Sequence, residues 1–144
     1  GLGAPHWRPD ARGLFTGITG GTTRAHIARA VLEGMALQIS DILGAMEQDA
    51  SIRLSGLKVD GGAARNNLLM QYQADILRTA CVRPTVLETT ALGSAFLAGL
   101  GVGFWDSPTA VQESWTEDST FNPQMRDDDV QGHLAAWAAA VAKA

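Results

Sequence analysis

Two adjacent glycines, Gly61 and Gly62, constrain this chain most, because they separate an apolar segment from a helical pattern within residues 59–67. Residues 57–59 are typical of a short buried strand, and the apolar spacing over 66–78 predicts a helix. A strand, a glycine turn and a helix start together present unpaired backbone N–H groups and positive partial charge. This arrangement suits a phosphate group. The alternative is a tight turn in which a glycine only supplies a positive φ.

The composition limits the class of protein. At 144 residues the chain has the length of one domain, and it is long enough to bury a core. Only 18% of the residues are charged, against about 25% in ordinary soluble domains, so we expect part of the surface to be covered by something else. The net charge of -4 comes without a basic patch, which argues against nucleic acid and anionic membranes as partners.

Several features bear on membrane insertion, on the cellular compartment and on whether the chain belongs to a longer polypeptide. No apolar run approaches the roughly 18 residues of a membrane span, so we expect no membrane span. The single cysteine, Cys81, excludes an internal disulfide and fits a reducing cytosol, so we expect a cytoplasmic protein. The turn-rich start without an initiator methionine predicts a cut inside a longer polypeptide.

The rest of the pattern predicts alternating strands and helices in one compact α/β unit. The expected elements are a strand at 13–18, a helix from 23 to about 46, a strand at 81–87, a helix at 91–100, a short helix after Ser107, an extended segment within 113–124 and a final helix from 127 to 143. Thr22 or Thr23 is the expected cap of the first helix, and its apolar stripe is interpreted as core.

Two carboxylates, Asp60 and Glu88, follow expected strands. A catalytic carboxylate pair is one interpretation of them. Capping of the helices that follow is the other.

Several segments together resemble the C-terminal part of the FGGY family of carbohydrate kinases. They are residues 1–7 with 10–13, 13–18 with 26–33, 59–62 with Asn66 and 69–77, and finally 83–84 with 88–93. The last pair is closer to the glycerol kinases than to the xylulose and other sugar kinases of the family. The resemblance covers the chain to about Trp105 and the tail more loosely.

The resemblance implies the C-terminal part of an actin/hexokinase-like, ribonuclease H-like ATPase domain, with a mixed sheet flanked by helices. Residues 1–144 would then divide into a nucleotide-binding core, 1–105, that lacks its first strands, and a C-terminal extension with a helix, 106–144. The first two strands and the glycerol-binding domain would precede Gly1.

The resemblance also implies an ATP-dependent phosphotransferase that gives glycerol 3-phosphate, with ATP and Mg²⁺ as cofactors. Gly62, with Gly61 beside it, is similar to the glycine whose backbone meets the nucleotide phosphates. Asn66 is similar to the asparagine that contacts adenosine. The catalytic base and the glycerol site belong to absent segments, so we expect no catalytic or metal-binding residue here and no activity from the chain alone.

Three alternatives stay open at this point. The chain could belong to another FGGY sugar or polyol kinase, to a non-catalytic actin-like ATP-binding module, or to a purely structural fragment in which Gly61 and Gly62 form a plain turn. The expected partners are ATP or ADP, glycerol through the missing part, and a second copy of the chain. Self-association is expected because missing strands expose a sheet edge and apolar helix faces.

Overall fold

The elements alternate as the sequence predicts, in a computed structural model that describes all residues from 1 to 144. In chain order they are α1 (Arg24–Ala50), β1 (Leu57–Lys58), the 3₁₀ helix η1 (Gly62–Arg65), α2 (Asn67–Leu77), β2 (Cys81–Pro84), α3 (Thr89–Gly101), α4 (Pro108–Gln112), β3 (Glu117–Phe121) and α5 (Asp127–Val141). The strands form one sheet in the order β1-β2-β3. Because β1 and β2 are parallel and β2 and β3 are antiparallel, the sheet is mixed.

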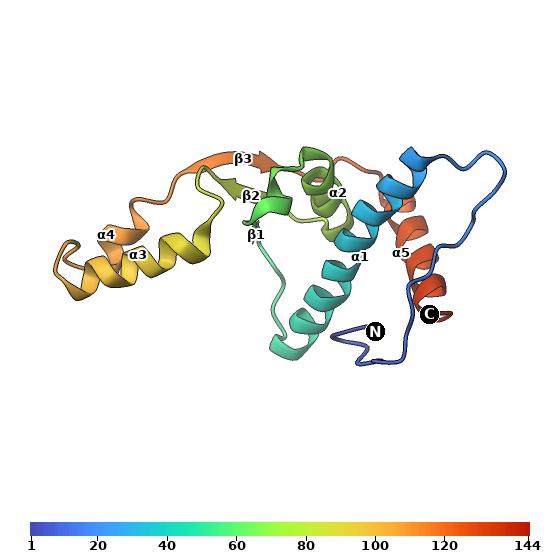
Figure 1. Cartoon of the computed structure of the whole chain (residues 1–144), viewed down its shortest axis with the longest axis horizontal. Coiled ribbons are helices and arrows are strands. Elements are labelled where there is room, and N and C mark those ends of the chain that lie inside the picture. Colours follow the sequence, from blue (N-terminus) through green and yellow to red (C-terminus); the bar gives the residue numbers. More distant parts are fainter.

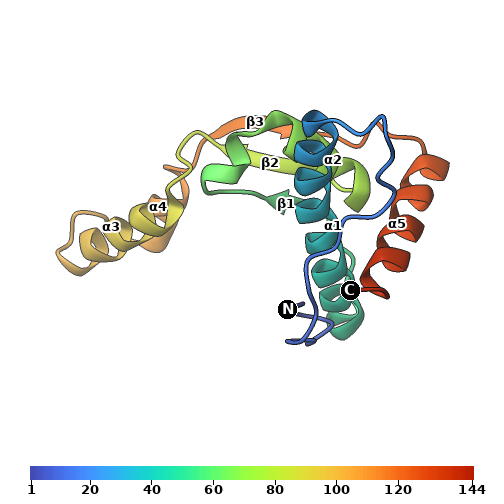
Figure 2. The same cartoon turned by 45° about the vertical axis from the view of Figure 1, so that its right-hand side comes forward.

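The chain has two regions, which we call the body and the arm. The body contains α1, α2, α5 and the sheet, and the arm contains α3 and α4 with their connections, residues 85–116. The arm extends away from the body at one end of the β2–β3 ribbon, in both Figure 1 and Figure 2. The two chain termini lie together on the opposite side of the body, where the Arg8 guanidinium donates to the Ala144 carbonyl at 2.8 Å.

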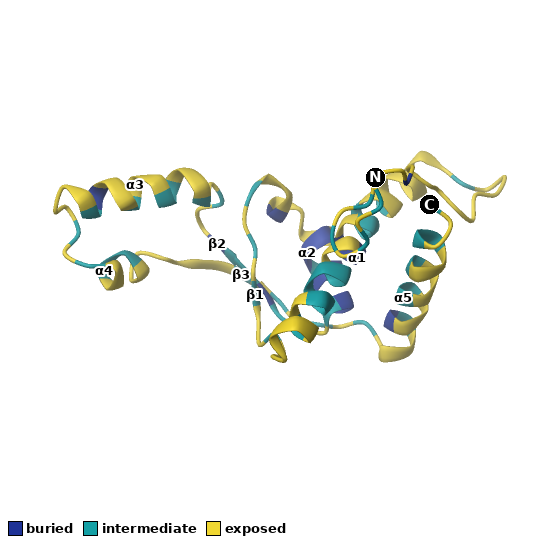
Figure 3. Cartoon of the chain, turned by 90° about the horizontal axis from the view of Figure 1, so that it is seen from below, coloured by how far each residue is buried: buried dark blue, intermediate teal, exposed yellow.

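The core lies between the three helices of the body. Its buried side chains are Ala36, Leu37, Ala64, Leu69, Met70, Tyr72, Ile76 and Val130. Two buried polar side chains on α2 strengthen this packing: the Gln73 amide donates to the Ala36 carbonyl at 3.2 Å, and the Asp75 carboxylate accepts from the Gln124 amide at 2.6 Å. Figure 3 shows that the buried residues are most numerous on α2, with others on α1 and α5.

The apolar stripe of α1 is only partly core, which corrects the interpretation from the sequence. Met35 and Ile39 are 47% and 39% exposed, and Met46 is 56% exposed, because no element of the chain covers this side of the helix. Only 15 of 144 residues are buried. The low charged fraction therefore has a structural counterpart in uncovered apolar surface.

The helix boundaries largely follow the local signals. Thr23 caps α1 in a capping box with His26, and Ser107 caps α4, whose first residue is Pro108. The final helix ends at Val141, two residues before the expected end, while α3 begins at Thr89, two residues early. None of the helices combines the length and apolar character needed to cross a bilayer.

The strand predictions were less accurate. Residues 13–18 form no strand, because no other segment of the chain pairs with them. β2 ends at Pro84, whose ring nitrogen cannot donate to a ladder, although the Thr85 amide still donates to the Thr116 carbonyl at 3.0 Å. Strand formation depends on a partner, and here the sequence pattern alone was insufficient.

Candidate functional site

The glycine turn follows β1 after Val59 and Asp60, and its two glycines have different roles. Gly61 has φ of 77°, a region that favours glycine, and its amide donates to the Leu87 carbonyl at 2.9 Å. Gly62 has ordinary φ, begins η1 and is exposed, and a Cβ built there meets nothing within 4 Å. The conformational need for glycine therefore falls on Gly61, while Gly62 leaves open space above the backbone.

The helix that starts at this turn is η1 and not α2, which corrects the expected strand–turn–helix unit. η1 spans four residues, and α2 begins only at Asn67. The amides of Gly62 and Ala63 have no backbone acceptor in the chain, as is usual at a helix start. These two exposed donors are the groups that the turn offers to a ligand.

Asn66 lies between η1 and α2 and acts as the N-cap of α2. Its Oδ1 accepts from the amides of Leu68 and Leu69, at 3.0 and 3.2 Å. The side-chain NH₂ group donates to no other residue, and Asn66 is exposed. Asn66 can therefore cap α2 with its oxygen and still donate to a ligand with its nitrogen.

Asp60 and Glu88 do not cap helices in the expected way. The Asp60 carboxylate accepts from the Thr89 hydroxyl, at the first residue of α3. Glu88 occupies the N-cap position of α3, but its side chain makes no capping hydrogen bond. The capping interpretation is therefore wrong for Glu88, and Asp60 joins two segments instead of capping η1.

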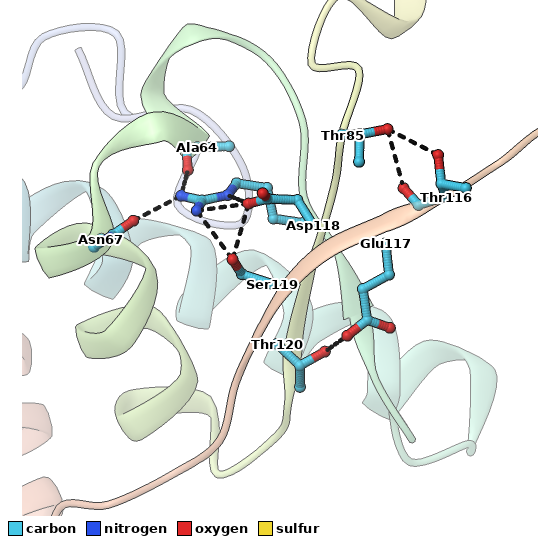
Figure 4. Close-up of polar contacts among 9 residues, drawn as sticks. Ala64, Asn67, Thr85, Thr116, Glu117, Asp118, Ser119 and Thr120 are labelled. Carbon is cyan, nitrogen blue, oxygen red and sulfur yellow. Dashed lines mark hydrogen bonds and ion pairs between the residues drawn. The ribbon is translucent and has the colours of Figure 1, made fainter.

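Arg83 on β2 makes hydrogen bonds to η1 and to the first residue of α2, contacts that sequence reasoning missed. Its guanidinium donates to the Ala64 carbonyl at 2.9 Å and to the Asn67 side chain at 2.8 Å, and it pairs with the Asp118 carboxylate on β3 at 2.7 Å (Figure 4). Hydrogen bonds from Ser119 and from Arg83 lower the pKa of Asp118. The one available signal was an arginine in an otherwise apolar strand.

An apolar hollow of about 530 Å³ lies beside the turn, between α1, β1 and α2. Met35, Ile39, Val59, Ala63 and Leu69 are among its lining residues. β1 pairs only with β2, so its other edge is free. The hollow and the free edge adjoin each other, because Leu57, Lys58 and Val59 line the hollow.

The chain contains no group of three or more His, Cys, Asp or Glu side chains placed to hold a metal ion.

Comparison with known proteins identifies the class to which this arrangement belongs. Residues 1–102 match the FGGY family of carbohydrate kinases, C-terminal domain. The chain belongs to this family. The expected fold class, an α/β unit with a mixed sheet from the C-terminal part of the actin/hexokinase-like domain, is confirmed.

Particular relatives are similar along the whole chain. The glycerol kinase of Myxococcus xanthus is 59% identical over 144 residues, which are 100% of this chain and 29% of the relative. Glycerol kinase 2 of Sulfolobus acidocaldarius is 54% identical over 144 residues, with the same coverage of 100% and 29%. The chain thus spans about three tenths of the length of these relatives.

Two solved structures agree with the assignment to this family and fold. The glycerol kinase of Plasmodium falciparum, crystallised with ADP, superposes with a TM-score of 0.87 at 39% identity, covering 99% of this chain and 29% of that one. A xylulose kinase from Lactobacillus acidophilus superposes with a TM-score of 0.76 at 21% identity, covering 96% of this chain and 28% of that one, which shows the fold alone.

Proposed function

We propose that this chain is the nucleotide-binding part of an ATP-dependent kinase that transfers the γ-phosphate of ATP to glycerol and gives glycerol 3-phosphate. The observation that carries this proposal is the 59% and 54% identity with two curated glycerol kinases along all 144 residues. The similarity to a glycerol kinase solved with ADP supports the same assignment and favours ATP and ADP as ligands. Mg²⁺ would accompany ATP, with its ligands supplied by the phosphates, water and other parts of the kinase.

Three residues would contact the nucleotide: Gly61, Gly62 and Asn66. The amides at the start of η1, of Gly62 and Ala63, would donate to phosphate oxygens, since they have no backbone acceptor in the chain. Asn66 would donate from its side-chain nitrogen to the adenosine portion, while its oxygen keeps the cap of α2. Residues 1–105 would form the nucleotide-binding core and residues 106–144 its extension.

The chain by itself is expected to phosphorylate nothing. Phosphoryl transfer depends on positioning the acceptor hydroxyl, the phosphates and the metal together. In the proposed kinase the base and the glycerol site come from the part of the polypeptide that precedes this chain. We define the complete kinase as this chain joined to that preceding part, taken either from its own polypeptide or, as a chimera, from the Myxococcus xanthus relative.

Steady-state kinetics of the complete kinase tests the proposed reaction. We expect glycerol to be phosphorylated with a higher kcat/KM than xylulose or gluconate. A preference for a sugar would favour another FGGY kinase, and nucleotide binding without turnover of any polyol would favour an actin-like binding module. Either result would contradict the proposed function.

We also propose that isolated copies of the chain associate with one another. The free edge of β1 and the uncovered side of α1 are surfaces that a second copy can cover. Sedimentation over a wide concentration range should detect dimers or larger species, and a monomer at every concentration would contradict this.

A cytoplasmic location is proposed as well, because a free thiol persists in a reducing compartment. Cys81 is buried, and its burial raises the pKa of the thiol to about 11.

A further inference from the structure

We propose that Asp60 is a positioning residue for the nucleotide, because it fixes the glycine turn to the base of the arm through Thr89. This inference rests on the proposed function of the turn. It assigns Asp60 neither to catalysis nor to helix capping, the two interpretations that its sequence position suggested.

The turn and the start of the arm are joined at two adjacent points. The Gly61 amide donates to the Leu87 carbonyl at 2.9 Å, and the Asp60 carboxylate accepts from the Thr89 hydroxyl. We call this pair of hydrogen bonds the turn clasp. Gly61 has φ of 77° and lacks a side chain, so the clasp limits a turn that would otherwise have wide conformational freedom.

A third contact connects Lys58 of β1, just before the turn, to the end of the arm. The Lys58 ammonium lies 4.2 Å from the centroid of the Trp115 ring, in a cation–π arrangement. Residues 58–61 therefore contact both connections of the arm, the one before α3 and the one after α4. A displacement of the arm base would be transmitted to the amides of Gly62 and Ala63.

The chemistry of Asp60 explains why its partner matters. A carboxylate beside a phosphate-binding turn repels an anion, because like charges disfavour one another at short range. The hydrogen bond to Thr89 holds the carboxylate against the arm, and a bond to an ionised acceptor is stronger than a neutral one. Asp60 is exposed, so its replacement removes this bond without opening a cavity in the core.

Kinetics of the complete kinase tests the clasp with four variants: Asp60→Ala, Asp60→Asn, Thr89→Val and the double variant of Asp60→Ala with Thr89→Val. We expect Asp60→Ala and Thr89→Val each to raise KM for ATP about five- to tenfold, with kcat and KM for glycerol unchanged. Asp60→Asn keeps a carbonyl acceptor for the hydroxyl and should stay within about twofold of the wild type. The double variant should be no worse than either single variant, because both remove the same bond.

Matched controls separate this role from a general effect. Asp49→Ala removes an exposed carboxylate at the end of α1. Thr90→Val changes the threonine next to Thr89, and the Thr90 hydroxyl makes no hydrogen bond to the turn. Both should leave KM for ATP unchanged. Melting curves of every variant identify loss of folding directly.

The outcomes separate a failure of the Asp60 role from a failure of the proposed nucleotide site. If Asn66→Ala raises KM for ATP while Asp60→Ala does not, the clasp is refuted and the nucleotide site stands. If Asp60→Ala lowers the melting temperature and changes both substrate constants together, or if Asp60→Asn is as impaired as Asp60→Ala, the positioning role is refuted. If neither Asn66→Ala nor Asp60→Ala changes KM for ATP, both proposals are refuted.

Discussion

The body and the arm differ in how much of their stability lies within the chain. The body encloses a core between α1, α2 and α5, in which Leu37 and Val130 are 7% and 1% exposed. In the arm, Leu97 is 73% exposed and Phe104 is 75% exposed. Apolar side chains of the core are therefore buried in the body, whereas these two large apolar side chains of the arm face solvent.

The arm has one local cluster of its own. The rings of Phe96 and Trp105 meet edge to face with centroids 5.2 Å apart, and Gly99 is buried against Trp105. Elsewhere on α3 the large apolar side chain of Leu97 stays exposed. The difference teaches that the body holds a core between three helices and the arm holds none, although the stripe of α1 in the body and Leu97 in the arm are both exposed apolar surface.

Two matched leucine truncations, one in each region, should show the largest difference between the body and the arm. Leu37→Ala leaves a cavity in the core, so we expect it to lower the free energy of unfolding by about 2–5 kcal/mol. Leu97→Ala changes an exposed side chain and should cost less than about 0.5 kcal/mol. Urea unfolding of the chain measures both, and equal losses would show that the arm is packed as tightly as the body.

Gly99→Ala should disturb the arm and leave the body intact. A Cβ at Gly99 would meet ring atoms of Trp105, which must move, and such overpacking costs about 1–3 kcal/mol. Gly101→Ala lies in the same helix with open space around it and serves as the control. The indole NMR signal of Trp105 should shift in the first variant only. A shift in signals from Tyr72 of the core would contradict the independence of the two regions.

Gly61→Ala addresses the junction between body and arm. Alanine at φ of 77° is strained, so we expect a loss of about 1 kcal/mol in the free energy of unfolding. Gly62→Ala, one residue later, has ordinary φ and free space for its Cβ, and it should change stability little. Thermal melts of the two variants measure the difference, and the opposite order of stability would refute the assigned roles of the two glycines.

Acidification should weaken the link between β2 and β3 slightly. Hydrogen bonds from Ser119 and from Arg83 lower the pKa of Asp118 in the folded chain. A depressed carboxyl pKa gives stability that is present above the unfolded pKa and is lost as pH falls through the folded pKa. The effect is small because Asp118 is exposed to solvent. Unfolding curves below pH 5 should show less acid dependence in Asp118→Asn, and an unchanged profile would contradict this.

The sequence predicted the helices well because their signals are local. Thr23, Asn66 and Ser107 mark helix starts with caps that follow directly from the chain. η1 was missed because a four-residue 3₁₀ turn has no periodicity, and the strand at 13–18 was wrong because a strand needs a partner. The stripe of α1 was interpreted as core because the pattern does not reveal which neighbour is present.

The candidate site was harder to predict from the sequence than the helices were. Residue spacing predicted a glycine turn suited to a phosphate, whereas the assignment of Gly62 and Asn66 to particular parts of a nucleotide came from the family resemblance. The Arg83 contacts join residues up to 36 positions apart, and the partner of Asp60 lies 29 positions away. Contacts over such distances depend on how strands and helices pack, which spacing does not encode.

The central claim is that residues 61–66 bind the nucleotide, and KM for ATP in Gly62→Val and Asn66→Ala tests it most directly. Since Gly62 has ordinary φ and nothing lies within 4 Å of its added Cβ, the valine variant should fold normally and meet only a bound phosphate. In the complete kinase we expect Gly62→Val to raise KM for ATP strongly and Asn66→Ala to raise it about five- to thirtyfold, with KM for glycerol unchanged. Wild-type KM for ATP in both folded variants would contradict the assignment.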